Sequence, residues 1–513
     1  MDISDYRREF ARFNSAFELA CFNHRAGFEP QLRSEAIYEQ YGGLFTREAV
    51  DDLRHAEESL PLHAGTERAG LHALYGAARI GHLETYVREL EDERARRESR
   101  VRVEWQDEQL SVHDVPKKIA AEPNANLRRE LTARWADAIG SCNDLRAARL
   151  NSLHQAARTL QAGSYTALYE DVKRLNYTQL AASTCAFLQQ TESCYAAVVA
   201  EDVARFLPGV ALSDLHHADF FYFQRMSGLD EFFSAGELLK TYCSAMSGLG
   251  IRTEAQPNIH IDAEARPSKN PRAACFRINP PDDVRLLLAP IGGVHDYTVF
   301  FHEAGHAQHF GWTSSDLMKR HPEFVYSPDY ATAEAYAFLL SNLFHDAGWL
   351  SEHLNLDPER AQEIARRLSL IKLYDVRRFC AKFNYEIALH DSTDSGDGIR
   401  SEYLAAKYTA LQKEATLFER DPNLYLWDVD DGFYGADYLR AWAFEVGLRE
   451  HLRLRYGRRW WASRKAGDEL IDLWNTSSRY SVEELARLIG FGKISFDQLA
   501  QSLIASATTK SGS

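Results

Sequence analysis

The stretch DYTVFFHEAGHAQHF, residues 296–310, decides the fold. It places an HExxH motif within an apolar helical pattern, and Asp296 is the predicted N-cap of that helix. His302 and His306 are one turn apart and share a face, so both imidazoles can bind one Zn²⁺. Glu303 is displaced by about a quarter turn, where it can act as general base on a water without binding the metal. A chain of this composition contains HExxH by chance about 0.05 times, so the apolar context strengthens the prediction of a metal site.

The motif needs a third ligand, which the sequence offers further along the chain. His309 lies about 10 Å along the helix axis from His302, too far to share the ion, so we expect it to contact the ligands and not the metal. Glu334 is the sole acid within the apolar part of a second predicted helix, which starts at Asp329 and ends near Gly348. An unpaired carboxylate there is costly, and zinc supplies a partner. Glu323 is predicted to be solvated in a Pro-flanked loop, so the predicted ligands of one Zn²⁺ per chain are His302, His306 and Glu334.

Composition sets the class of protein. The 513 residues are 45% hydrophobic and 26% charged, which is typical of a globular enzyme. The net charge of -15 opposes binding to nucleic acid or anionic lipid. No run of eighteen apolar residues predicts a membrane span, and the acidic start predicts no secretory signal, so we expect a cytoplasmic protein. The seven cysteines are scattered without a CxxC pair, which indicates neither a disulfide framework nor a thiolate metal site.

The chain is predicted to be mainly α-helical and to divide into two regions. Residues 1–209 show nearly uninterrupted helical periodicity and are predicted to form an N-terminal helical lobe. Residues 210–513 are predicted to form the catalytic region, although the two lobes can interleave. Within it, residues 259–262 and 273–278 have the pattern of short strands among prolines, which indicates a small sheet.

Several segments resemble the thimet oligopeptidase and oligoendopeptidase family of zinc metallopeptidases. Residues 301–309 resemble its metal-binding helix, and Glu334 follows His306 by 28 residues, similar to the family's third ligand. Residues 269–276 resemble the edge strand that pairs with the substrate backbone, and residues 432–438 resemble a Gly/Tyr-rich loop. The matches cover roughly residues 210 to 460.

The resemblance implies a prolate, two-lobed helical zincin fold with a small β-sheet near the active-site cleft. It also implies that Tyr434 or Tyr438 stabilises the oxyanion, without distinguishing between them. This chain departs from the family in having Trp427–Asp431 where a histidine usually precedes the loop, and Phe338 where an acidic partner of the ligands would stand in angiotensin-converting enzymes. The residues expected to contact the peptide or to flank its binding site are Ala273, Ala274, Cys275, Gly292, Gly293 and Arg440; for Arg440 an internal carboxylate is the alternative partner.

The predicted function is zinc-dependent hydrolysis of peptide bonds in short peptides, with Glu303 as general base. One alternative is a carboxypeptidase or dipeptidyl carboxypeptidase with the same metal site, for which Arg440 or Lys269 would bind the terminal carboxylate. A second alternative is a helical interaction scaffold that binds no metal. The sequence contains no GxSxG elbow, GxGxxG fingerprint or complete phosphate loop, so other catalytic classes find no support. It does not determine the oligomeric state.

Overall fold

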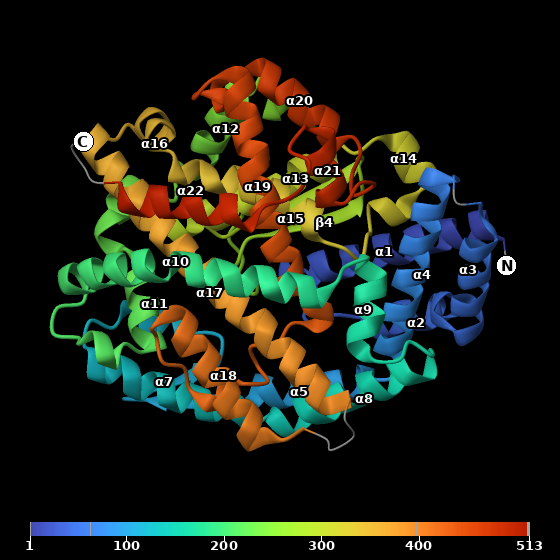
Figure 1. Cartoon of the computed structure of the whole chain (residues 1–513), viewed down its shortest axis with the longest axis horizontal. Helices are drawn as coiled ribbons and strands as arrows, with labels where there is room; N and C mark the ends of the chain where they lie inside the picture. The colour runs from blue at the N-terminus through green and yellow to red at the C-terminus, as the bar shows by residue number, and fades with distance from the viewer. Residues whose placement is uncertain (1, 62, 395–398, 510–513) are drawn as a thin grey trace.

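The structure is a computed structural model that describes residues 2–61, 63–394 and 399–509. Within these residues the chain forms 22 α-helices and five short strands (Figure 1). The predicted fold class, a mainly α-helical protein with a small sheet, is confirmed. All seven cysteines are free thiols.

The N-terminal region is helical, as predicted, except for one hairpin. Strands β1 (Arg102–Trp105) and β2 (Glu108–Ser111) pair antiparallel and were not predicted. Only two β1 side chains, Val103 and Trp105, are buried, so the alternation is too short to detect among charged neighbours. The helices are α1 (Ile3–Arg25), α2 (Ser34–Gln40), α3 (Arg47–Ser59), α4 (Gly65–Thr85), α5 (Arg88–Arg100), α6 (Val115–Ala121), α7 (Ala125–Gly140), α8 (Asn143–Thr159), α9 (Tyr165–Lys173) and α10 (Tyr177–Phe206).

The second region carries the predicted metal helices. The single helix expected over residues 329–348 is wrong: α15 ends at Ser341, and a 3₁₀ turn over Asn342–His345 follows. Asp346 then starts a new helix by accepting a hydrogen bond from the Trp349 amide at 3.0 Å. The helices are α11 (His217–Arg225), α12 (Leu238–Gly248), α13 (Val294–Gly311), α14 (Ser315–Arg320), α15 (Ala331–Ser341), α16 (Ala347–Leu354), α17 (Pro358–Asp394), α18 (Ser401–Thr416), α19 (Tyr434–Tyr456), α20 (Arg464–Trp474), α21 (Val482–Leu488) and α22 (Phe496–Thr508).

The predicted small sheet has three strands in the order β3-β5-β4. Strand β3 (Ile259–Asp262) has the predicted bounds, and β4 (Ala274–Asn279) starts and ends one residue later than predicted. The central strand β5 (Asp283–Leu287) was missed; it lies parallel to β3 and antiparallel to β4. Strand β4 is therefore an edge strand in the described part of the sheet.

The two regions interleave around long helices (Figure 1). Helices α13, α15 and α19 to α21 gather in the upper part of the view, and α5, α7, α8 and α18 in the lower part, while α10 and α17 cross the middle. Helix α1 packs against strand β4 of the small sheet, and the centres of the Phe22 and Phe276 rings are 5.5 Å apart. The boundary at residues 209 and 210 stays a prediction, because elements from both sides share one apolar core.

The two helices that carry the predicted metal ligands, α13 and α15, cross in close contact at Gly305. A Cβ atom added to Gly305 would lie 2.6 Å from the Ala337 Cα and 2.8 Å from the Tyr336 carbonyl oxygen. Both distances are shorter than a normal van der Waals contact of a methyl carbon with a carbon or oxygen atom. A Cβ atom at this position would therefore displace the backbone of one of the two helices. The glycine inside the HExxH motif is thus required by helix packing.

Gly305→Ala is expected to destabilise the protein by about 1–3 kcal/mol, because the added methyl group forces two backbones apart. Gly447→Ala on α19 is the matched control, since its Cβ would meet only the Phe491 ring at 3.8 Å. That control is expected to be neutral or slightly stabilising, as alanine is the better helix former. Urea unfolding of both variants measures the difference, and equal stabilities would contradict the close crossing.

Candidate metal centre

Helix α13 begins differently from the prediction. Its N-cap is Gly293, with φ of 93°, and the helix starts at Val294. Asp296 lies in the first turn, and its Oδ2 accepts hydrogen bonds from the amides of Ile291 at 2.6 Å and Gly292 at 2.8 Å. The prediction of Asp296 as N-cap is therefore wrong by one turn; its carboxylate instead holds the loop that enters the helix.

Three predicted ligands come together where α13 and α15 cross. Glu334 Oε2 lies 3.2 Å from His302 Nε2 and 3.7 Å from His306 Nε2. One ligand atom from each of the three residues falls within 4.8 Å of the others. The glutamate side chain is 4% exposed, and the histidine side chains are 17% and 14% exposed, so the cluster remains open to solvent on the histidine side.

The electrostatics of the cluster fit a divalent metal. Burial lowers the pKa of His306 to about 4, which leaves its ring neutral and able to bind a metal at pH 7. Burial also opposes ionisation of Glu334, but the neighbouring His306 and His302 outweigh it and lower the pKa of this carboxyl. Glu334 Oε2 is buried without a hydrogen-bond partner among the described residues. Two imidazole nitrogens and a carboxylate oxygen without a hydrogen-bond partner are the donor atoms of a His₂Glu zinc site.

Glu303 points toward the edge strand. Its Oε2 accepts a hydrogen bond from the Cys275 amide at 2.8 Å. Burial raises the pKa of Glu303, although the neighbouring His302 and the Cys275 amide partly offset this. A carboxylate with a raised pKa accepts a proton more readily near neutral pH, as a general base must.

The two candidate tyrosines lie at the site in different surroundings. The Tyr434 hydroxyl donates a short hydrogen bond to Glu334 Oε1. The Tyr438 ring is 5.0 Å from the Tyr434 ring and 5.3 Å from the Phe338 ring. For the Tyr438 hydroxyl the structure shows no hydrogen bond within the described residues.

Apart from Arg440, the predicted peptide-binding residues lie in two places: at the edge strand β4 and in the loop that precedes α13. In an antiparallel strand both backbone polar groups of a residue face the same side. Because the Cys275 amide faces Glu303, the backbone amide and carbonyl groups of Cys275 face the open edge of β4. Ala273 lies one residue before the start of this strand. The prediction for Ala274 is corrected: its backbone groups face β5. The Gly292 and Gly293 loop packs on residues 230–235, where the Gly293 amide bonds to the Phe233 carbonyl at 2.8 Å.

Arg440 is a structural residue and not a free ligand for substrate. Its side chain is 1% exposed, and its guanidinium bonds to Asp329 at 2.9 and 3.1 Å and to Glu483 at 2.8 Å through two nitrogens. Asp437, which accepts from Lys173 at 2.8 Å, completes this buried network. The peptide-binding interpretation of Arg440 is therefore corrected in favour of the internal one.

Lys269 has a different partner from the one predicted, and His309 lies beside the centre without a hydrogen bond to the predicted ligands among the described residues. The Lys269 ammonium is buried and bonded to Asp262 at 2.9 Å, so it is not available to a peptide carboxylate. The His309 ring is fully buried against Phe310 and Tyr336, and no hydrogen bond links it to His302 or His306 among the described residues. It supports the site by packing.

Two charged residues, Glu323 and Arg277, have surroundings that the sequence did not predict. Glu323 is not solvated; its buried carboxylate pairs with Arg7 at 2.9 Å and His321 at 3.0 Å. Arg277 lies within the edge strand β4, and its guanidinium carbon is 5.3 Å from the centre of the Phe310 ring. The sequence feature that could have pointed to Arg277 is its position between two buried residues of β4, Phe276 and Ile278.

The arrangement of the helices and the small sheet is similar to that of solved oligoendopeptidase structures. No protein-family model and no curated protein matches the sequence.

Among solved structures, a protein assigned as a peptidase from Chlamydophila abortus is similar over 98% of this chain and 89% of its own, with 15% identity and a TM-score of 0.65. PZ peptidase A, solved with an inhibitor, has 15% identity, coverage of 97% and 90%, and a TM-score of 0.64. The M32 carboxypeptidase from Deinococcus radiodurans R1 is 13% identical, with 98% coverage of both chains and a TM-score of 0.57. These similarities establish the shared fold.

None of the helices in the described ranges combines the length and apolar character needed to span a membrane.

Arg440→Met is expected to destabilise the protein by about 1–3 kcal/mol, since it leaves the partly buried carboxylates of Asp329 and Glu483 without their cation. Arg453→Met, on the solvent side of the same helix, is the control and is expected to change stability by less than about 0.5 kcal/mol. Thermal unfolding of both variants is the measurement. A fully stable Arg440→Met protein would contradict the structural role.

Proposed function

We propose that the protein is a zinc-dependent peptidase. The observation that supports this most directly is the unpartnered, buried Glu334 Oε2, which faces the two HExxH imidazoles across the helix crossing. His302, His306 and Glu334 would hold one zinc ion. When bound at such a donor set, zinc acidifies water and polarises a carbonyl group.

The protein side chains then divide the remaining work. Glu303 accepts a proton from the attacking water and passes it to the leaving amine, as its position beside the ligands and its raised pKa support. The open edge of β4 binds the extended peptide through the Cys275 and Ala273 backbone groups. In the structure Glu303 and the Cys275 amide bond to each other, so the carboxylate stands next to the expected position of the substrate backbone.

The two tyrosines have separate roles in this proposal. Tyr434 orients the ligand Glu334 through its hydrogen bond, which makes it a positioning residue. Tyr438 keeps its hydroxyl free and donates it to the oxygen that becomes negatively charged during attack. The different partners of the two hydroxyl groups support this assignment.

We further propose that the substrates are short, unstructured peptides. The side chains of the centre are largely buried, and nearly 200 residues of additional helix precede the catalytic region. An extended strand partner must enter this recessed position, which a folded protein cannot supply.

One tightly bound Zn²⁺ per chain is expected by elemental analysis after dialysis. Glu334→Ala should lose the metal, because it removes the only carboxylate of the donor set. Tyr434→Phe should weaken zinc affinity by about 10- to 100-fold, as loss of a ligand's hydrogen-bond partner does, while Tyr438→Phe should retain it. Absence of zinc from the wild-type protein would favour the scaffold alternative, and full zinc in Glu334→Ala would place the third ligand elsewhere.

Glu303→Gln is expected to keep the zinc and to lose activity by about 10²–10⁴-fold, because the amide cannot accept the proton. The assay follows cleavage of a flexible peptide of about ten residues, long enough to extend on both sides of the site. The same sequence placed in a stable folded domain serves as the comparison and should resist cleavage. A normal rate for Glu303→Gln would remove Glu303 from the mechanism, and equal rates on peptide and folded domain would contradict the size restriction alone.

A further inference from the structure

Lys372 on α17 is unlike the buried lysines of this protein. Lys173, Lys269 and Lys382 each have a carboxylate partner, at distances of 2.8, 2.9 and 2.8 Å. Lys372 is partly exposed, and the structure shows no ion pair or hydrogen bond to its ammonium among the residues it describes. The Lys372 ammonium is therefore a cation without a bonded anion.

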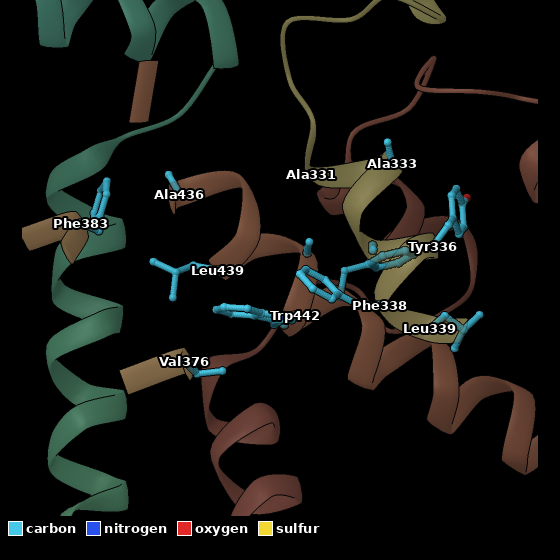
Figure 2. Close-up of a cluster of buried hydrophobic side chains, with 14 of the residues drawn as sticks. Ala331, Ala333, Tyr336, Phe338, Leu339, Val376, Phe383, Ala436, Leu439 and Trp442 are labelled. Atoms are coloured by element: carbon cyan, nitrogen blue, oxygen red, sulfur yellow. The ribbon is translucent and has the colours of Figure 1, made fainter. Parts of the chain in front are cut away.

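Aromatic rings hold this ammonium close to the metal centre. Its Nζ lies 4.0 Å from the centre of the Phe338 ring and 4.4 Å from that of the Trp442 ring. Figure 2 shows Phe338 of α15 next to Trp442 of α19, and the two ring centres are 5.1 Å apart. The Phe338 ring is also 5.0 Å from the His302 ring. One phenyl ring is thus in contact with both Lys372 and a predicted metal ligand.

The nearest anionic side chains do not neutralise Lys372. Glu445 bonds to Arg449 and Asn342, both at 2.8 Å, and Asp375 and Glu334 act only from a distance. Burial lowers the pKa of Lys372 to about 7, and the attraction of Glu445 and Asp375 does not compensate. An anion bound beside the ammonium would supply the missing charge.

The direction of a bound peptide places one end of it at Lys372. Strand β4 runs in the same direction as α13, because Cys275 contacts Glu303 in mid-helix and Arg277 lies over Phe310 near the helix end. A peptide that pairs antiparallel with β4, the more stable arrangement, runs the opposite way. Its C-terminal part therefore extends past His302 toward the start of α13, which is the side where Phe338 and Lys372 lie.

We propose that Lys372 binds the free α-carboxylate of the substrate, one or two residues beyond the cleaved bond. Each extended residue spans about 3.3–3.6 Å, so a segment of this length can bridge from the metal ligands past the Phe338 ring. The inference rests on the proposed peptidase function and adds its substrate class: peptides with a free C-terminus, from which one or two residues are released. It replaces Arg440 and Lys269, which are committed to internal carboxylates, as the cation that recognises the terminus.

The test compares a flexible peptide carrying a free C-terminal carboxylate with the same peptide carrying a C-terminal amide. The zinc-loaded wild-type protein should prefer the free acid by about 10- to 100-fold in kcat/KM, mainly through KM, since a charge-assisted bond is lost in the amide. Mass spectrometry of the products should show release of one or two C-terminal residues. An amidated peptide ending in glutamate distinguishes the α-carboxylate from an acidic side chain and should be cleaved as slowly as the other amide.

Lys372→Met should abolish the preference between acid and amide, and Lys372→Arg should retain most of it. The exposed Lys465→Met is the control and should behave as wild type. A variant that lowers both rates equally and keeps the preference would show a merely structural role and overturn the proposal.

Binding provides a readout independent of turnover. Calorimetry with a dipeptide and its amide, on the Glu303→Gln protein, should show tighter binding of the free acid only when Lys372 is present. Equal affinities there, or equal cleavage of acid and amide by the wild type, would overturn the role of Lys372 and leave the peptidase function intact. Failure of the wild type to cleave any of the peptides would instead contradict the proposed function.

Discussion

The close crossing of α13 and α15 at Gly305 is the constraint on which the centre depends. Two backbones approach there to a distance that excludes even one methyl group. This approach brings Glu334 within 3.7 Å of both histidine Nε2 atoms, although 28 residues separate it from His306. The same residue type that permits helix packing thus determines whether three ligands can meet.

Around this crossing, buried charged side chains form ion pairs with one another. The Arg440 network joins the loop before α15 to α19 and α21, and so fixes the helix that presents Tyr434 and Tyr438. Asp428 is bonded to Arg378, Lys382 and Arg420 and anchors the preceding loop to α17. Glu334 Oε2 and the Lys372 ammonium are among the polar groups of the described residues for which the structure shows no hydrogen bond. The Phe338 ring lies 4.0 Å from the Lys372 Nζ and 5.0 Å from the ring of His302, a predicted ligand beside Glu334.

The edge strand β4 links the fold to the proposed chemistry. The open edge exists because β5 inserts between β3 and β4 and leaves one side of β4 unpaired in the described sheet. Glu303 bonds to that edge at Cys275, so the proposed base and the proposed substrate-binding backbone are held together by one hydrogen bond. The direction of β4 relative to α13 then determines the direction of any peptide that pairs with β4. It therefore determines on which side of the site the C-terminal part of the peptide lies.

The sequence by itself determined the features that depend on local spacing and on burial cost. Helical periodicity placed His302, Glu303 and His306 correctly on one helix, and the cost of a lone acid in an apolar stretch singled out Glu334. Only the tertiary structure decided which charged side chains form internal ion pairs. Arg440 pairs with a residue 43 positions away and Glu323 with one 316 positions away. Lys269 pairs with the nearby Asp262, but the sequence does not reveal that this pair is buried. The tertiary structure also decided the strand β5, the facing of Ala274 and the separate partners of the two tyrosines, because these follow from contacts between distant segments. The position of Lys372 beside the centre is of the same kind, since no spacing along the chain brings α17 to Phe338.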